Sequence, residues 1–363
     1  MRTRRLFAAA VILISLAGAA AVGTAGYLLV ERPRVHMLGG LRQLSLVRAY
    51  LFNPKVRRFA AALHAQDPHT DVFKTMWDTN AGALLSRRMF RELDMDGVQK
   101  YAYKPNIRKL GFVTGSGAMQ WRMEAVDTPG LRDVLSELDT TFLVHASYDE
   151  NGFRHVDRAV TEGCQRRVLF LGDSFTDGLW VDDGDTFANV YGHIARDRSG
   201  VGVCPVNAGV NGYGSFEERF VLEHEFDAAG RPSLIFVMYF PNDVDQDYDA
   251  VVNGTLDDVD RLWTDSLVDV RRMHRFAAEH GSTLVLAAIP PSEQLFARAP
   301  QTHYQDILRE FAANEGVMFV NLYDGLLVHD PHPLYWPWDP HFTPAGHRAV
   351  AELLYDSTSG LLK

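Results

Sequence analysis

Short apolar runs alternate with amphipathic stretches through the second half of the chain. The runs are rich in Val, Ile, Leu and Phe and are bounded by polar residues or glycine, which is typical of buried strands, whereas the stretches repeat apolar residues with the period of a helix. Strands are predicted at Val168–Leu171, Val203–Asn207, Leu234–Tyr239, Thr283–Ile289 and Met318–Leu322, and helices at Thr186–Arg196, Phe216–Ala229, Trp263–His280 and His303–Ala313. This repeated order predicts an α/β domain with a parallel sheet wrapped by helices.

A last helix is predicted over Ala345–Tyr355. Thr343 is a suitable N-cap for it, and Pro344 suits the first turn, where a backbone N–H has no partner within the helix. His347 lies at the start of this helical pattern, so we interpret it as a surface or capping residue.

The chain begins with a basic and then an apolar segment. Three arginines occur among residues 1–5, and residues 6–30 are uncharged and mainly apolar. As a helix this run would measure about 37 Å, enough to cross a bilayer. The arginines favour a cytoplasmic N-terminus, which places everything after Glu31 outside the cytoplasm. We expect residues 1–31 to be an uncleaved, single-pass signal anchor in the cell membrane. The alternative is a secreted protein whose signal peptide is cleaved, since small residues between positions 17 and 23 suit signal peptidase.

Residues 32–160 form an accessory region between the anchor and the α/β domain, which is expected at residues 161–363. The accessory region is predicted to be helical at Leu41–Leu63 and Thr70–Arg91, and extended with turns at Tyr101–Trp121. It carries no catalytic pattern. A spacer, a lid and a partner-docking surface are the alternatives for its role.

Composition fits a globular domain on a tether. The chain has 363 residues, of which 47% are hydrophobic and 23% charged, so it is long enough to bury a sizeable core. The formal net charge is −10. An acidic chain has no global positive field for nucleic acid, so we expect no nucleic-acid partner.

Four polar blocks follow the predicted strands of the domain. Gly172-Asp173-Ser174 follows the first strand, Asn207 to Gly214 the second, and Phe240 to Asp243 the third, while Asp339 to His347 precedes the last helix. A serine hydroxyl is a weak nucleophile, so Ser174 needs a base and donors for a developing oxyanion.

The blocks supply each of these groups. His341 can take the Ser174 proton and return it to the leaving group, and Asp339 can fix the imidazole tautomer and stabilise its charged form. Gly209 lets a backbone N–H approach the reacting oxygen, and the side-chain amide of Asn242 offers a second donor.

Taken in order, the four blocks resemble the SGNH hydrolases, the GDSL-type serine esterases and acyltransferases, over Arg166–Lys363. The resemblance implies a flavodoxin-like, three-layer α/β/α fold. It also implies a role for each block. The catalytic residues are the nucleophile Ser174 with His341 and Asp339. The oxyanion hole is formed by Ser174, Gly209 and Asn242, and the supporting carboxylates are Asp173 and Asp243.

The blocks depart from the family pattern at two positions. Phe240 stands where the third block commonly has Gly, and Trp338 stands where the last block commonly has Asp. The carboxylate must therefore come from Asp339, two residues before His341. The segment Asp149–Arg154 resembles a lead-in found ahead of the first block in membrane-linked members, so we expect it to pack against the domain.

Other chemistries fit the sequence less well. The glycines from Gly209 to Gly214 have the wrong spacing for a dinucleotide fingerprint, and no phosphate-binding loop is present. Asp243–Asp249 begins like a calcium loop, but Tyr248 replaces the required glycine, and the histidines lack the spacing of a helical zinc pair. We expect no metal and no cofactor.

The chain has two cysteines, Cys164 before the first strand of the domain and Cys204 in the second. The family fold makes these strands neighbours. Outside the cytoplasm a disulfide is one alternative, and two buried thiols are the other.

Three functions remain open. The leading one is an extracytoplasmic serine esterase that removes a short acyl group from an envelope carbohydrate or lipid. The second is an O-acyltransferase that uses the same residues on an envelope glycan, with a multi-pass partner supplying the acyl donor. The third is a non-catalytic envelope protein. Aromatic residues beside the blocks could stack on sugar faces or simply form core, namely Tyr213, Phe240, Tyr335, Trp336 and Trp338.

Overall fold

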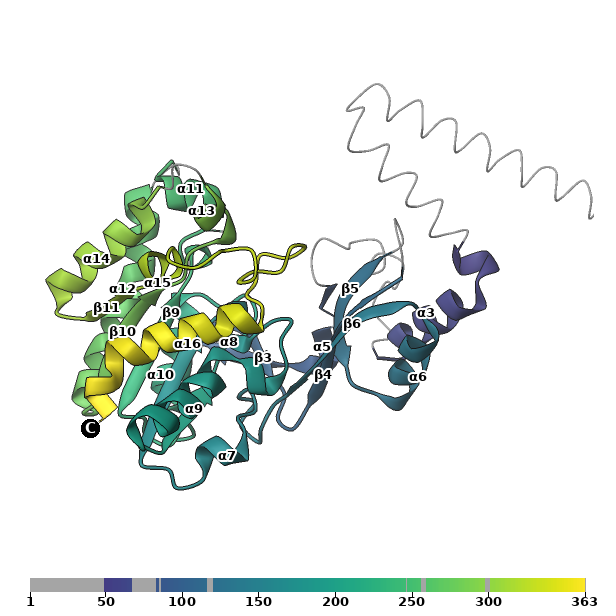
Figure 1. Cartoon of the computed structure of the whole chain (residues 1–363), viewed down its shortest axis with the longest axis horizontal. Coiled ribbons are helices and arrows are strands. Elements are labelled where there is room, and N and C mark those ends of the chain that lie inside the picture. Colours follow the sequence, from purple (N-terminus) through teal and green to yellow (C-terminus); the bar gives the residue numbers. More distant parts are fainter. Residues whose placement is uncertain are drawn as a thin grey trace, which may run out of the picture. The chain divides into compact units, whose positions relative to one another are not determined.

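The computed structural model describes residues 49–66, 83–84, 86–115, 120–245, 247–255, 259–297 and 301–362. These residues belong to two compact units (Figure 1). The first unit consists of the described residues up to residue 84, together with those within Val113–Met123 and Thr128–Phe142. The second unit consists of the remaining described residues. Among the described helices, none is both long and apolar enough to cross a membrane. The predicted anchor, residues 1–31, lies outside the described residues.

The first unit contains a pair of packed helices. Helix α3 (Pro54–Gln66) contacts α6 (Pro129–Glu137). The pair is joined by polar contacts to Glu137, since Lys55 Nζ donates to its backbone carbonyl at 2.7 Å and Arg58 pairs with its carboxylate. Thr128 caps the start of α6, because its side chain accepts from Leu131 N, and Pro129 follows as the first residue of the helix.

The second unit is built on a five-stranded sheet. Its strands pair in parallel in the order β11-β10-β9-β7-β8, which is the doubly wound order of flavodoxin-like folds. The strands are β7 (Arg166–Gly172), β8 (Val203–Asn207), β9 (Leu234–Tyr239), β10 (Thr283–Ala288) and β11 (Met318–Asn321). All six residues of β9, at the centre of the sheet, are buried, as expected for a strand covered on both faces.

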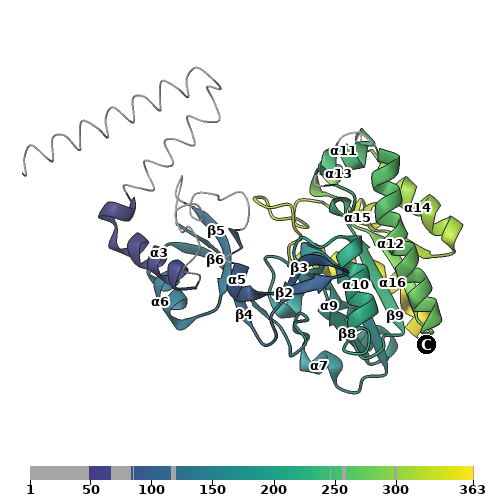
Figure 2. The same cartoon turned by 180° about the vertical axis from the view of Figure 1, so that it is seen from behind.

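Helices cover both faces of this sheet. Figure 1 shows α9 (Phe187–Ser199) and α16 (Pro344–Thr358) on the near face, and Figure 2 shows α10 (Ser215–Glu225) and α12 (Val259–Glu279) on the other. The other helical elements of this unit are α5 (Ser86–Met89), α7 (Arg158–Thr161), α8 (Ser174–Asp177), η2 (Asp183–Asp185), η3 (Pro241–Asp243), α11 (Tyr248–Asn253), α13 (Ser292–Phe296), α14 (His303–Glu315), α15 (Leu322–Leu326) and η4 (Ser359–Leu362).

The remaining strands precede the five-stranded sheet in the chain. Strands β2 (Phe90–Met95) and β3 (Val98–Tyr103) form an antiparallel hairpin. A four-stranded sheet has the order β1-β5-β4-β6, with strands β1 (Ala83–Leu84), β4 (Arg108–Thr114), β5 (Trp121–Val126) and β6 (Thr140–Ser147).

The predicted β-α pattern of the second unit is confirmed. Each predicted strand overlaps one of the five parallel strands, and Thr343 caps α16 with Pro344 in its first turn. The accessory region is less regular than predicted. Of the predicted helix Thr70–Arg91, only residues 86–89 are helical among those described, and a strand begins at Phe90.

The two cysteines form a disulfide, with their Cα atoms 5.5 Å apart. Cys204 lies in β8 beside Arg167 of β7, and Cys164 lies two residues before β7 begins. Of the two alternatives left by the sequence, the structure has the disulfide.

Candidate active site

Ser174 is placed at the carboxyl end of the sheet by a single helical turn. Strand β7 ends at Gly172, and Ser174 is the first residue of α8. Asp173 caps this turn, because its Oδ1 accepts from Phe175 N at 2.9 Å, and Gly178 ends it in a left-handed conformation with φ of 80°. The serine is therefore held at the point where the sheet order reverses, between β7 and its neighbours β8 and β9.

Ser174, His341 and Asp339 form a continuous chain of hydrogen bonds. Ser174 Oγ lies 2.7 Å from His341 Nε2, and His341 Nδ1 lies 2.5 Å from Asp339 Oδ1. The same Asp339 oxygen accepts from the backbone N–H of His341 at 3.1 Å. This is the order of contacts that a serine nucleophile, a general base and an orienting carboxylate require.

The Asp339 carboxyl is kept ionised by its neighbours. Burial alone would raise its pKa, but hydrogen bonds and charge from His341, with a hydrogen bond from the Trp180 side chain, lower that pKa below its ordinary value. The ionised carboxylate is the form that stabilises a charged imidazole.

Trp180 was not singled out in the sequence. It is buried and has a φ of 69°, a left-handed conformation that is strained for a bulky residue. Its ring packs edge-on against Trp338, with centroids 5.4 Å apart. Such an outlier often marks a functional site, yet single-sequence reasoning has no signal for positive φ at tryptophan.

The residues expected to form the oxyanion hole gather at the same edge. The Gly209 N–H donates to Asn207 Oδ1 at 3.1 Å, and Asn242 Nδ2 donates to Asp173 Oδ2 at 2.9 Å. A side-chain amide has two donor hydrogens, so this bond leaves Asn242 a second one for a ligand. Gly209 must lack a side chain, because a Cβ there would lie 2.2 Å from the backbone nitrogen of Asp177.

Of the two supporting carboxyls, that of Asp173 belongs to a buried residue and that of Asp243 to a half-buried one. Burial raises the pKa of Asp173 to about 6, against the opposing hydrogen bonds from Phe175 and Asn242 and the charge of His341. Burial and nearby carboxyls raise the pKa of Asp243 well above its ordinary value, although its Oδ2 accepts from Phe240 N at 2.9 Å.

A third buried carboxyl, Glu218 on α10, was missed. Burial and then the charges of Asp243 and Asp173 raise its pKa well above the ordinary value. In the sequence Glu218 is an ordinary polar position of a predicted helix, and nothing in the helical period shows that it faces the site.

The interpretation of His347 as a surface residue is wrong. It is 1% exposed, and its Nδ1 accepts from the backbone N–H of Phe187 at 3.1 Å. Burial and positive charge nearby lower its pKa to about 3, so this histidine is neutral at physiological pH. The first turn of α16 packs inward, and the imidazole of His347 accepts a hydrogen bond from the first backbone N–H of α9.

The aromatic residues beside the blocks divide into two groups. Tyr213, Phe240 and Tyr335 are buried and belong to the core. Trp336 and Trp338 are partly exposed, with stacked rings 5.4 Å apart, and line an open cavity of about 420 Å³ that also includes Asp339. Among the described residues, no cluster of His, Cys, Asp or Glu is arranged to hold a metal ion.

Comparison with known proteins gives a family for part of the chain. Residues 170–349 match the family described as GDSL-like Lipase/Acylhydrolase, and no curated protein matches the sequence. Among solved structures, the chain is similar to Axe2, an acetylxylan esterase from Geobacillus stearothermophilus, with 18% identity, 54% of this chain and 95% of that chain covered, and a TM-score of 0.43. It is also similar to TesA, with 17% identity, 54% of this chain and 99% of that chain covered, and a TM-score of 0.43. A third similar structure is LAE5, an alpha/beta hydrolase enzyme from the metagenome of Lake Arreo, Spain. It has 20% identity, 56% of this chain and 99% of that chain are covered, and the TM-score is 0.43.

Proposed function

We propose that this ester-hydrolysing serine hydrolase, whose residues 170–349 match the GDSL-like Lipase/Acylhydrolase family, removes a short acyl group from a carbohydrate ester of the cell envelope. The observation that carries this proposal is the unbroken chain of hydrogen bonds from Ser174 through His341 to Asp339.

The proposed reaction has two halves. Ser174 Oγ attacks the ester carbonyl carbon while His341 Nε2 takes its proton. The oxyanion is stabilised by the Ser174 N–H, by the Asn242 amide and by the Gly209 N–H, which exchanges its bond to Asn207 Oδ1 for one to the oxyanion. The sugar oxygen then leaves with the proton from His341. His341 then takes a proton from a water molecule, and this water attacks the acyl-enzyme. The attack releases the acid and restores Ser174.

The open cavity beside Asp339 supports a carbohydrate as the leaving group. Its lining includes Trp336, Trp338 and Phe296, and Phe296 has 47% of its surface exposed. Aromatic side chains combine apolar area with rigid faces, and so suit the apolar face of a sugar ring. A sugar bound in this cavity would have its ester oxygen close to His341, the residue that returns the proton to it.

The envelope location rests on the sequence. Residues 1–31 have the pattern of a signal anchor, and the Cys164–Cys204 disulfide suits an oxidising compartment. The same anchor favours the second candidate, an O-acyltransferase, because acyl donors have to be delivered across the membrane by a multi-pass partner. In that reaction a glycan hydroxyl in place of water attacks the acyl-enzyme.

The test is turnover of an aryl acetate and of an acetylated oligosaccharide by the full chain in detergent, with Ser174→Ala as the inactive variant. Ser199→Ala, at the end of α9, is the control for a serine outside the site. We expect turnover by the wild type and Ser199→Ala, and only the uncatalysed rate with Ser174→Ala. Acetyl transfer to an added glycan would favour the transferase, and turnover retained by Ser174→Ala would refute the serine mechanism.

The carbohydrate site has a separate test. Phe296→Ala should raise KM for the acetylated oligosaccharide and leave aryl acetate turnover unchanged, because Phe296 lines the cavity, and the ring that it contacts there is that of His332, which is not a catalytic residue. Val328→Ala, at an apolar residue that is 81% exposed and not among the cavity lining, is the matched control. Equal KM values in all three proteins would exclude this cavity as the sugar site.

A further inference from the structure

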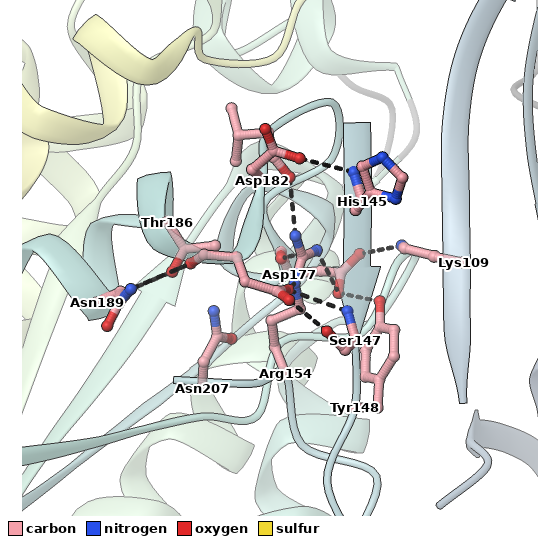
Figure 3. Close-up of polar contacts among 12 residues, drawn as sticks. Lys109, His145, Ser147, Tyr148, Arg154, Asp177, Asp182, Thr186, Asn189 and Asn207 are labelled. Carbon is pink, nitrogen blue, oxygen red and sulfur yellow. Dashed lines mark hydrogen bonds and ion pairs between the residues drawn. The ribbon is translucent and has the colours of Figure 1, made fainter. Parts of the chain in front are cut away.

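The last residue of the nucleophile turn, Asp177, is held by residues far away in the sequence. Lys109 Nζ donates to Asp177 Oδ2 at 2.7 Å, Tyr103 OH donates to the same oxygen at 3.1 Å, and Tyr148 OH donates to Oδ1 at 2.6 Å. Figure 3 shows Lys109 and Tyr148 converging on the Asp177 carboxylate. These donors come from β4, β3 and the residue after β6, all in the region that the sequence left without a role.

The Arg154 side chain binds the backbone of Asp177 and the chain that follows it. Its Nη1 donates to the backbone carbonyl of Asp177 at 2.9 Å, its Nη2 to that of Val181 at 2.8 Å, and its Nε to Asp183 Oδ1 at 2.7 Å. Its backbone N–H donates to the carbonyl of Asn207 at 2.9 Å. Arg154 therefore joins the nucleophile turn to the start of the second block, which carries Gly209.

Two further backbone contacts fix the segment that follows the turn. The N–H of His145 donates to Asp182 Oδ1 at 2.7 Å, and the N–H of Ser147 donates to Asp183 Oδ1 at 3.0 Å (Figure 3). The carboxyl-terminal part of β6 thus holds the chain directly after α8.

The network is buried and charged. Burial alone would lower the pKa of Lys109, but the carboxylates of Asp177 and Glu124 raise it overall, and Lys109 Nζ lies 2.8 Å from Glu124 Oε1. The positive charges of Lys109 and Arg154 outweigh the effect of burial on Asp177 and lower its pKa. Lys109 and Asp177 are therefore ionised at neutral pH. Loss of one partner would leave a buried charge without compensation.

Helix α8 needs such external contacts. It has four residues, and a single helical turn is not stable by itself because nucleating a helix is unfavourable. The position of Ser174 Oγ relative to His341 is consequently set by the residues that bind this turn from outside. Misplacing a nucleophile by about 1 Å can lower the rate about 100-fold.

We propose that Lys109 and Arg154 are positioning residues that act through Asp177 and its backbone to hold Ser174 in register with His341. This inference rests on the proposed function. It gives residues 86–112 and 143–157 the role of an integral part of the catalytic machinery, in place of a spacer, a lid or a docking surface.

A buried arginine elsewhere in the same unit provides the control. Arg219 is 2% exposed and pairs with Asp96, Glu223 and Asp269 at 2.6 to 2.8 Å, and none of these ion-pair partners among the described residues belongs to α8. Arg154→Met and Arg219→Met remove the same group from comparable networks. Both should lower the thermal unfolding midpoint, so stability alone cannot separate them.

The discriminating measurements are kcat for an aryl acetate and the rate at which a fluorophosphonate labels Ser174, both below the unfolding transition in the full chain. Arg154→Met should lower kcat and the labelling rate by about 10- to 100-fold with KM within about twofold, and Arg219→Met should change neither. Unchanged kcat and labelling in folded Arg154→Met, or equal losses in both variants, would overturn the proposal.

A milder pair covers the case in which Arg154→Met does not fold. Tyr148→Phe removes only the hydroxyl that donates to Asp177, and Tyr191→Phe removes a buried hydroxyl bonded to Thr358 at 2.8 Å. Labelling should slow by about tenfold in Tyr148→Phe alone, and equal labelling in the two variants would refute the positioning role. If Ser174→Ala is labelled as fast as the wild type, the proposed function has failed instead.

Discussion

The buried carboxyl of Glu218 gives the sharpest prediction for stability. Glu218 is 1% exposed, and neither of its carboxylate oxygens has a hydrogen-bond partner among the described residues. Burial, followed by the charges of Asp243 and Asp173, raises its pKa well above the ordinary 4.5. The folded protein therefore holds a proton that the unfolded chain releases.

The sign of the effect on stability follows from this difference. Below the unfolded pKa both states are protonated, and the full stability is present. As the pH rises the unfolded chain ionises first, so the free energy of unfolding falls by up to about 1.4 kcal/mol per pH unit until the folded pKa is passed. Asp173 sets the scale, since its rise from 3.8 to about 6 corresponds to about 3 kcal/mol.

Glu218→Gln should remove this loss, because glutamine has a similar shape and does not ionise. We expect little difference from the wild type at pH 4.5 and a growing advantage for the variant from pH 5 to pH 8, measured by urea unfolding at each pH. Glu310→Gln, at an exposed position of α14, is the control for losing a carboxylate and should follow the wild type. A difference between Glu218→Gln and the wild type that is constant with pH would refute the reasoning.

Three further changes test the site and its support. Asn242→Ala should lower kcat for an aryl acetate by about 100- to 1,000-fold with KM nearly unchanged, since one oxyanion donor is lost; a change confined to KM would instead make Asn242 a binding residue. Gly209→Ala should lower both kcat and the urea midpoint, because its Cβ would meet Asp177 N at 2.2 Å, and an active, stable variant would contradict that packing. Replacing Cys164 and Cys204 by serine should cost about 4 kcal/mol of unfolding free energy in urea, as expected for a loop closed over 40 residues, and an unchanged midpoint would show that the disulfide contributes nothing.

The parallel sheet and the meeting of the blocks were predictable because both depend on local patterns. Apolar runs of strand length define β7, β8 and β9, and each polar block begins where its strand ends. Parallel strands place their carboxyl ends at one edge of the sheet, so Ser174, Gly209 and Asn242 had to come together once the strands paired.

The Asp177 network was not predictable for the opposite reason. Lys109 and Asp177 are 68 residues apart, and neither stands out in its local pattern. A lysine in a strand usually faces water, and only the packing of β4 against the nucleophile turn makes Lys109 a buried partner. Trp180 and Glu218 were missed in the same way, because backbone strain and the burial of a single helix position arise from tertiary structure.

The spacing between Asp339 and His341, one residue shorter than the usual pattern, has a local explanation. An Asp side chain tends to bond the backbone N–H two residues ahead, and Pro340 has no N–H to compete for the carboxylate. Asp339 Oδ1 therefore accepts from the His341 N–H at 3.1 Å, and this turn brings the ring Nδ1 within 2.5 Å of the same oxygen. The flanking chain closes the turn, because Trp336 N donates to His341 O at 3.1 Å. A sequence Asp-Pro-His thus encodes its own carboxylate–imidazole contact, so the aspartate can be lost from the position of Trp338 without loss of that contact.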